Sequence, residues 1–251
     1  MKLSYCLLPA LGLLICPLEA QSIIGSWFIK NAGEAQSDAV VTFLVDGTYT
    51  MAEDGNSKLD PSGEDGMERG TYKWNPTTQA FSVKTLVDTT GEWGFSNAKF
   101  KTASISGTKL TIADDSGKFS LKRVEGGSKL VGSWYAKDGA GYAVVTFLSD
   151  GKFFMVQDGQ PMFGGKTGVE RGTYTWNSAT KVFTPKVLLD TNGTWGFSTK
   201  YDRTISISGN KLTLNVIGDG KFTLARVIEP AKPKAAPRSV SRQLLEALLG
   251  L

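Results

Sequence analysis

One pattern of about a hundred residues occurs twice in this chain, and this duplication restricts the possible folds more than any other feature. The stretch GSWFIK at residues 25–30 returns as GSWYAK at residues 132–137. Further matches follow in the same order in both halves: VVTFLVDGTYTM and VVTFLSDGKFFM, MERGTYKWN and VERGTYTWN, LVDTTGEWGFS and LLDTNGTWGFS, GKFSLKRV and GKFTLARV. The repetition predicts two copies of one folded unit, at residues 22–125 and 130–228.

Within each unit, polar and apolar residues alternate with a period of two, which is typical of strands with one buried face. Turn pairs such as Asp46-Gly47 and Asp150-Gly151 separate the alternating runs and favour tight hairpins. No stretch within a unit has helical periodicity. In the first unit we expect eight or nine short strands, near residues 24–30, 39–45, 48–52, 68–74, 80–88, 92–96, 99–106, 108–113 and 117–124.

A meander of about eight strands with one apolar face is expected to close into an up-and-down barrel, because closure removes the exposed strand edges. The sequence therefore predicts an all-β chain that forms two antiparallel up-and-down β-barrels in tandem. A two-sheet sandwich is the alternative, but the local hairpins give no sign of the long return connection that such a fold uses.

A tryptophan and an arginine stand at opposite ends of each unit. In the last strand of each copy, an arginine ends a series of apolar residues that share one face. A cation at an apolar position needs a partner, and the first and last strands of a closed barrel are neighbours. We therefore expect Arg123 to lie over Trp27 and Arg226 over Trp134, as a structural lock worth roughly 0.5–2 kcal/mol per pair.

This arrangement resembles the signature of the lipocalins and the wider calycin group, in which Gly-x-Trp opens the first strand and an arginine late in the last strand packs over the tryptophan. The units are shorter than typical lipocalins and lack their disulfide and C-terminal helix. They are more similar to compact bacterial lipocalin-like repeats. The resemblance implies a barrel and room for a pocket, and it specifies no ligand.

Acidic and aromatic residues at matching positions are the candidate ligand-binding residues. In the first unit, alternation places Glu68, Tyr72 and Trp74 on one face of a strand, and Trp93 follows a hairpin turn. The matching residues of the second unit are Glu170, Tyr174, Trp176 and Trp195. An acid, a phenol and an indole at a barrel mouth suit a small polar or cationic aromatic ligand. The alternative is structural: the aromatic residues fill the core, and the acids lie at the rim in solvent or pair with a neighbouring strand.

The loop at residues 54–66 gathers several acidic residues, which supply the oxygen ligands that calcium prefers. The second copy of this loop lacks most of them. A solvated loop explains both copies, so calcium binding stays a hypothesis for the first unit alone.

Catalytic chemistry has little support in the sequence. The 251 residues include no histidine, and both cysteines, Cys6 and Cys16, precede the first unit. The commonest general base, the commonest metal ligand and a reactive thiol are therefore missing from the units. Phosphate-binding loops and nucleophile elbows are also absent from the sequence, and a formal charge of +4 does not indicate a nucleic-acid partner. We predict a protein that is not an enzyme and uses no cofactor.

The two ends of the chain differ from the repeats. Residues 1–20 have a lysine, an interrupted apolar run and a final small residue, which is typical of a cleaved secretory signal peptide. This predicts a secreted or periplasmic protein with no transmembrane segment in the mature chain. Residues 229–251 combine a Pro/Lys-rich linker with a short amphipathic helix that needs a protein or envelope partner to dock on. A disordered terminus is the alternative.

The sequence thus predicts an exported protein that binds a small, partly apolar molecule in one or both barrels. The alternative is a structural or adhesive surface protein whose barrels are filled with side chains. The interior volume separates the two hypotheses, because ligand sites usually exceed about 300 Å³.

Overall fold

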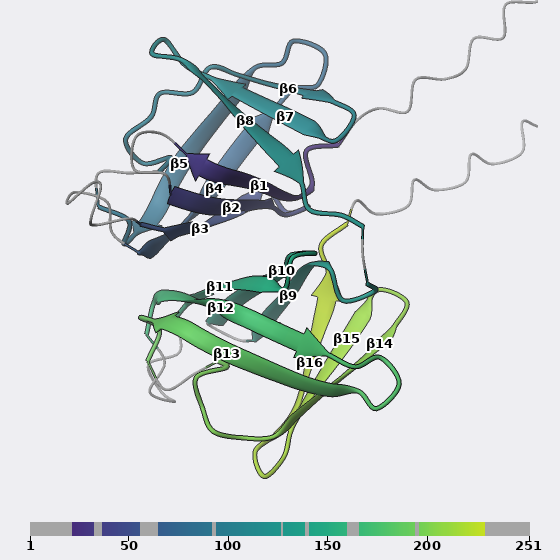
Figure 1. Ribbon diagram of the computed structural model, residues 1–251. Helices are drawn as coiled ribbons and strands as arrows, with labels where there is room; N and C mark the ends of the chain where they lie inside the picture. The colour runs from purple at the N-terminus through teal and green to yellow at the C-terminus, as the bar shows by residue number, and fades with distance from the viewer. Residues whose placement is uncertain are drawn as a thin grey trace, which may run out of the picture.

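The computed structural model describes residues 22–32, 37–55, 65–91, 94–126, 128–138, 141–159, 166–193 and 196–228, which form two antiparallel β units in tandem (Figure 1). The expected signal peptide at residues 1–20, the tail at residues 229–251, Trp93 and Trp195 lie outside the described residues.

The first unit is an eight-stranded sheet with the order β5-β4-β3-β2-β1-β8-β7-β6. Its strands are β1 (Gly25–Ala32), β2 (Ser37–Phe43), β3 (Thr48–Asp54), β4 (Gly66–Trp74), β5 (Phe81–Asp88), β6 (Thr102–Ser106), β7 (Lys109–Ala113) and β8 (Lys118–Arg123). The edge strands β5 and β6 meet only at an isolated bridge between Ala80 and Thr102, beside a 2.9 Å hydrogen bond from the Phe81 amide to the Lys101 carbonyl. The sheet therefore curls round to its own edge without forming a continuous ladder there.

The second unit is a closed barrel with the order β10-β11-β12-β13-β14-β15-β16-β9. Its strands are β9 (Gly132–Asp138), β10 (Gly141–Phe147), β11 (Lys152–Asp158), β12 (Gly168–Trp176), β13 (Val182–Asp190), β14 (Arg203–Ser208), β15 (Lys211–Val216) and β16 (Gly220–Arg226). Closure occurs where β13 pairs with β14 and β16 pairs with β9. The prediction of an all-β chain with two tandem up-and-down barrels is confirmed, with one unit closed and the other curled.

The expected strand at residues 92–96 is wrong over its described part, because residues 94–96 form a bend. Gly94 has a φ of 99°, a region that strands do not use and that favours glycine. A Cβ at this position would also lie 2.2 Å from the Glu68 carboxylate. The chain therefore turns here to pass close to a buried acid.

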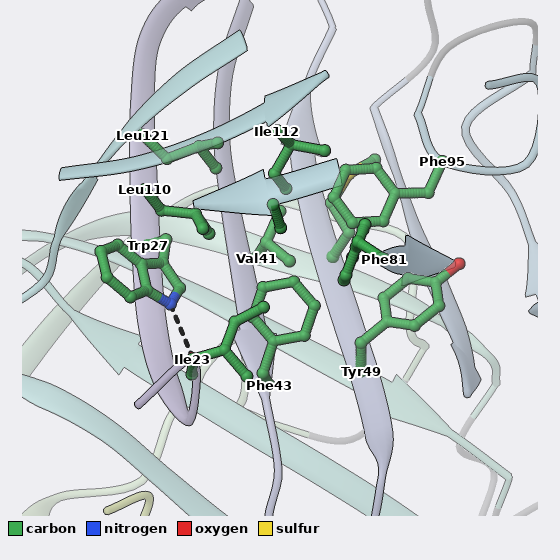
Figure 2. Close-up of a cluster of buried hydrophobic side chains, with 12 residues drawn as sticks. Ile23, Trp27, Val41, Phe43, Tyr49, Phe81, Phe95, Leu110, Ile112 and Leu121 are labelled. Atoms are coloured by element: carbon green, nitrogen blue, oxygen red, sulfur yellow. Dashed lines mark hydrogen bonds between the residues drawn. The ribbon is translucent and has the colours of Figure 1, made fainter. Parts of the chain in front are cut away.

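The core of the first unit fills the space enclosed by its sheet. The fully buried side chains there include Trp27, Phe43, Tyr49, Leu110 and Ile112. Figure 2 shows Trp27 at one end of this cluster, where its indole Nε1 donates a 2.8 Å hydrogen bond to the Ile23 carbonyl, and Tyr49 and Phe95 at the other. The two ends of the barrel therefore differ: one is closed by the lock tryptophan, and the other holds polar groups.

The two units pack against each other through the outer faces of strands β1–β4 and β9–β12 (Figure 1). β3 contacts β11, and both strands are buried on both of their faces. An apolar cluster fills this interface and consists of Val40, Ala52, Met67, Leu148, Phe154, Val156 and Val169.

Charged pairs at the interface follow an approximate two-fold symmetry. Arg69 forms an ion pair with Asp158, and Arg171 pairs with Asp54 at 2.6 Å. Arg69 and Arg171 are matching residues of the repeat, as are Asp54 and Asp158, so the same pair occurs on both sides. The hydroxyls of the matching serines Ser26 and Ser133 hydrogen-bond to each other. The units are therefore arranged like the subunits of a symmetric dimer.

Candidate functional site

The tryptophan and arginine of each unit lie together where the first and last strands pair. The Arg123 guanidinium lies 4.0 Å from the centre of the Trp27 ring, and Arg226 lies 4.1 Å from that of Trp134. Both arginines also donate to backbone carbonyls, those of Ile24 and Val131 at 2.9 Å among them. The guanidinium groups are thus held by a ring on one side and by carbonyl oxygens at their edge.

The glycine of the Gly-Ser-Trp motif is explained by the same contact. Gly25 and Gly132 both have a φ of 119°, and a Cβ on either would lie 2.8 Å from the Nη1 atom of its arginine. A side chain at this position would strain the backbone and push the arginine away from the ring. Glycine, tryptophan and arginine therefore act as one structural unit.

The aromatic residues predicted as ligand-binding donate hydrogen bonds from their side chains to backbone carbonyls of the same barrel. The Tyr72 hydroxyl donates to the Leu44 carbonyl at 2.8 Å, and the Trp74 indole donates to the Ala103 carbonyl at 2.8 Å. The second unit repeats both bonds, from Tyr174 to Leu148 at 2.8 Å and from Trp176 to Ile205 at 3.1 Å. All four side chains pack on the interior cores. This geometry favours their structural interpretation.

The predicted acids lie inside the barrels and not at the rim, since Glu68 and Glu170 are both fully buried. In the first unit, the Glu68 carboxylate accepts 3.0 Å hydrogen bonds from the Ser96 amide and from the Tyr49 hydroxyl. The Tyr49 hydroxyl also hydrogen-bonds to Thr85 at 2.6 Å. Burial raises the pKa of Glu68, and these donors oppose the shift.

The second unit keeps the acid and loses its side-chain donor. Phe153 and Val187 occupy the positions that match Tyr49 and Thr85. The Glu170 carboxylate accepts a 2.7 Å bond from the Phe197 amide, while its Oε1 has no hydrogen-bond partner among the described residues. Burial raises the pKa of Glu170 to about 7.

The interior of the second barrel contains a cavity of about 710 Å³. Most of its wall is apolar and comes from the inner faces of the strands, from residues Ala136, Ala143, Val145, Phe147, Met155, Ile205, Leu212, Leu214, Val216, Phe222 and Leu224. The other lining residues are Gln157, Gly196, Phe197, Thr199, Tyr201 and Asp219. The volume falls within the range of about 300–1,000 Å³ that small-molecule sites occupy.

A buried arginine holds one wall of this cavity. The wall consists of the segment 196–201, which supplies four of the lining residues. The Arg203 guanidinium donates to the carbonyls of Tyr201 and Thr199, at 2.7 Å each, and lies 5.9 Å from the centre of the Phe197 ring. Burial lowers the pKa of Arg203. Glu170 therefore accepts a hydrogen bond from a backbone amide of this segment, and Arg203 donates hydrogen bonds to two of its backbone carbonyls.

In the first barrel, an aromatic side chain occupies the corresponding region. The Phe100 ring packs 4.8 Å from Phe95 and 6.2 Å from both Phe81 and Phe119. The matching residue in the second unit is Asp202, which is exposed. The sequence predicted a ligand inside one or both barrels but did not identify the residues that line this cavity, and the exchange of Phe100 for an aspartate was the signal that could have located it.

Comparisons with known proteins identify no family. No family model matches the chain, and no curated protein matches it. Among solved structures, the DNA polymerase III β subunit from Pseudomonas aeruginosa matches at 9% identity over 86% of this chain and 61% of that chain, with a TM-score of 0.13. The β clamp from Helicobacter pylori matches at 9% identity over 88% and 64%, with a TM-score of 0.14. The chain thus spans less than two thirds of these clamps, and such scores support no conclusion about fold or function.

The described ranges contain no helix long and apolar enough to cross a membrane. They also contain no group of three or more acidic, histidine or cysteine side chains placed to hold a metal ion. Residues 56–64 of the acidic loop lie outside the described residues, so its calcium hypothesis stays a prediction.

Proposed function

We propose that the protein binds a small, partly apolar molecule inside its second barrel. The cavity of about 710 Å³ in the interior of the second barrel, lined mainly by residues of β9–β11, β14–β16 and the segment 196–201, is the observation that carries this proposal. Its apolar wall favours an apolar body, and the polar residues Gln157, Thr199 and Tyr201 can orient a ligand. The proposed activity is binding without catalysis.

We also propose that the protein is related to the lipocalins and that it is exported from the cell. The stacked pairs of Arg123 on Trp27 and Arg226 on Trp134 support the relationship, because they reproduce the lock that the resemblance implies. The signal-like sequence at residues 1–20 supports export.

A structural role is the second candidate, and one observation favours it for the first unit. Phe100 and its aromatic neighbours Phe81, Phe95 and Phe119 occupy the region that corresponds to the cavity. The outer face of this unit also packs against the second barrel. In this interpretation the first unit is a filled barrel that supports the ligand-binding one.

Binding is tested with N-phenyl-1-naphthylamine, an uncharged dye that fluoresces in apolar surroundings. We expect saturable binding by the full chain. Leu214→Phe places a larger side chain inside the cavity and is expected to weaken binding by at least ~10-fold, because the ring occupies space that the dye would fill. Leu188→Phe makes the same substitution on the outside of the same barrel, where Leu188 is exposed, and is expected to leave binding unchanged. Equal affinities of the two variants, or no saturable binding by the wild type, would overturn the proposal.

A further inference from the structure

Resting on the proposed function, we propose that the second barrel selects an uncharged molecule that combines an apolar body with an oxygen hydrogen-bond acceptor, and that Gln157 recognises this oxygen. Carboxylates with the same apolar body are excluded. Two features of the cavity lead to this inference: the charges along its wall and the unused donor of one buried amide.

The described residues that line the cavity include no lysine and no arginine, and the one charged side chain among them is Asp219. A second acid, Glu170, lies directly behind the wall, because a Cβ on the lining residue Gly196 would lie 2.0 Å from its Oε2. A ligand carboxylate would lose its hydration and meet negative charge. Burying an anion without a partner is strongly unfavourable.

Arg203 is a cation that contacts the segment 196–201 of the cavity wall, and the hydrogen bonds of its guanidinium go to that segment. It is buried behind the segment 196–201 and does not line the cavity. Its Nη1 and Nη2 atoms donate to the carbonyls of Tyr201 and Thr199, and its Nε, which has no partner among the described residues, is buried and does not line the cavity. Turning the guanidinium toward a ligand would break the bonds that hold the wall, so Arg203 is poorly placed to bind a carboxylate.

Gln157 supplies the polar contact. Its side chain is 3% exposed, lies on the cavity wall and comes from β11 two residues after the lining residue Met155. Its Oε1 accepts a 3.3 Å hydrogen bond from the Asn192 side-chain amide. This bond fixes the oxygen of the amide and leaves its Nε2 available as a donor. Nε2 has no acceptor among the described residues.

A buried donor without an acceptor destabilises the structure, so an oxygen atom that reaches it from the cavity gains a favourable bond. An alcohol, ether or carbonyl oxygen provides that acceptor without adding charge. An ammonium group provides only donors and cannot bind Nε2. The first unit carries Glu53 at the matching position, so this donor is specific to the second barrel.

The test displaces the bound dye with three ligands that share one alkyl chain: decan-1-ol, decanoate and decylammonium, at pH 8. We expect decan-1-ol to bind at least ~10-fold more tightly than decanoate, because the carboxylate would bury its charge beside Asp219 and Glu170, and more tightly than decylammonium, which gives Gln157 Nε2 no acceptor. An ion that binds as tightly as the alcohol, or more tightly, overturns the inference. If the dye itself does not bind, the proposed function fails instead, so the two failures are distinguishable.

Gln157→Leu tests the recognising residue, because it keeps the size of the side chain and removes the amide. We expect ~5-fold weaker binding of decan-1-ol and less than two-fold change for the dye, which carries no oxygen. Circular dichroism confirms that the variant is folded. Equal loss for the alcohol and the dye would show that Gln157 only shapes the cavity, and an unchanged affinity for both would remove it from the site.

Discussion

Glu68 and Glu170 show how one neighbouring residue changes the state of a buried acid. The two carboxyls occupy the same place in the repeat and both accept backbone amide bonds. Only Glu68 also receives a hydroxyl, from Tyr49, because Phe153 stands at the matching position of the second unit. Glu170 is therefore the less well compensated acid, with a pKa raised to about 7.

This shift predicts a pH-dependent stability. The folded state retains a proton on Glu170 that the unfolded chain releases above its ordinary pKa of 4.5. The contribution to the free energy of unfolding is therefore complete below about pH 4.5 and is lost as the pH rises through about 7. Glu170→Gln removes the contribution of Glu170 and keeps that of Glu53, whose pKa burial also raises to about 7, so denaturant titrations at pH 4.5 and 8 should show a smaller loss of stability in the variant than in the wild type.

Phe153→Tyr provides the complementary change. A hydroxyl at this position restores the donor that the first unit supplies to its acid, so it should lower the pKa of Glu170 and stabilise the protein by about 1 kcal/mol at pH 8. The matched control is Tyr49→Phe, which removes the donor from Glu68 and should destabilise by a similar amount. If both substitutions leave the pH dependence unchanged, the hydroxyl does not determine the state of the acids.

The surroundings of Glu68 could be predicted from the sequence only in part. Alternation correctly placed Glu68 on the inner face with Tyr72 and Trp74. The alternative position at the rim is wrong, since Glu68 is fully buried and accepts a hydrogen bond from Tyr49 of the neighbouring strand β3. Another donor is the backbone amide of Ser96, 28 residues further along the chain. A backbone donor leaves no mark on the sequence, so the contact that makes burial tolerable could not be predicted.

At the scale of the strand, the first and last elements of each unit depend on one contact. β1 meets β8 at Trp27 and Arg123, and these two residues also stack. The strand pattern and turn chemistry predicted most elements because local residues determine them. The bend at residues 94–96 could not be predicted in this way, because it depends on the close approach of Glu68 to Gly94.

Arg123→Ala tests the lock. The variant loses the cation–π contact and the hydrogen bonds to backbone carbonyls, together worth about 2 kcal/mol, which corresponds to a fall of about 4–8 °C in the melting temperature of a protein this size. Lys122→Ala on the same strand is the control, because Lys122 is exposed, and its melting temperature should stay within about 1 °C of the wild type. Equal melting temperatures for the two variants would reject the lock.

At the scale of the whole molecule, the duplication produced two units with different interiors and one shared surface. The exchange of Phe100 for Asp202 accompanies the open interior of the second barrel, while Val40, Phe154 and Val156 join the outer faces. Sequence analysis left the relative orientation of the units open, because the outward apolar residues of β3 and β11 resemble core residues until both units are seen together. The interface explains why these strands are apolar on both faces.

The shared surface predicts that the two units unfold together. Val156 is 4% exposed in the interface cluster, so Val156→Asp buries a charge among apolar side chains of both units and should destabilise the contact by about 3 kcal/mol. Calorimetry should then resolve two transitions where the wild type has one, because neither interior core is touched. Val182→Asp places the same charge at an exposed position of the second barrel and should keep the single transition. Two transitions in the wild type would mean that the units unfold independently and that the two-fold contact serves orientation alone. A single transition in Val156→Asp would mean that this apolar contact is not what couples them.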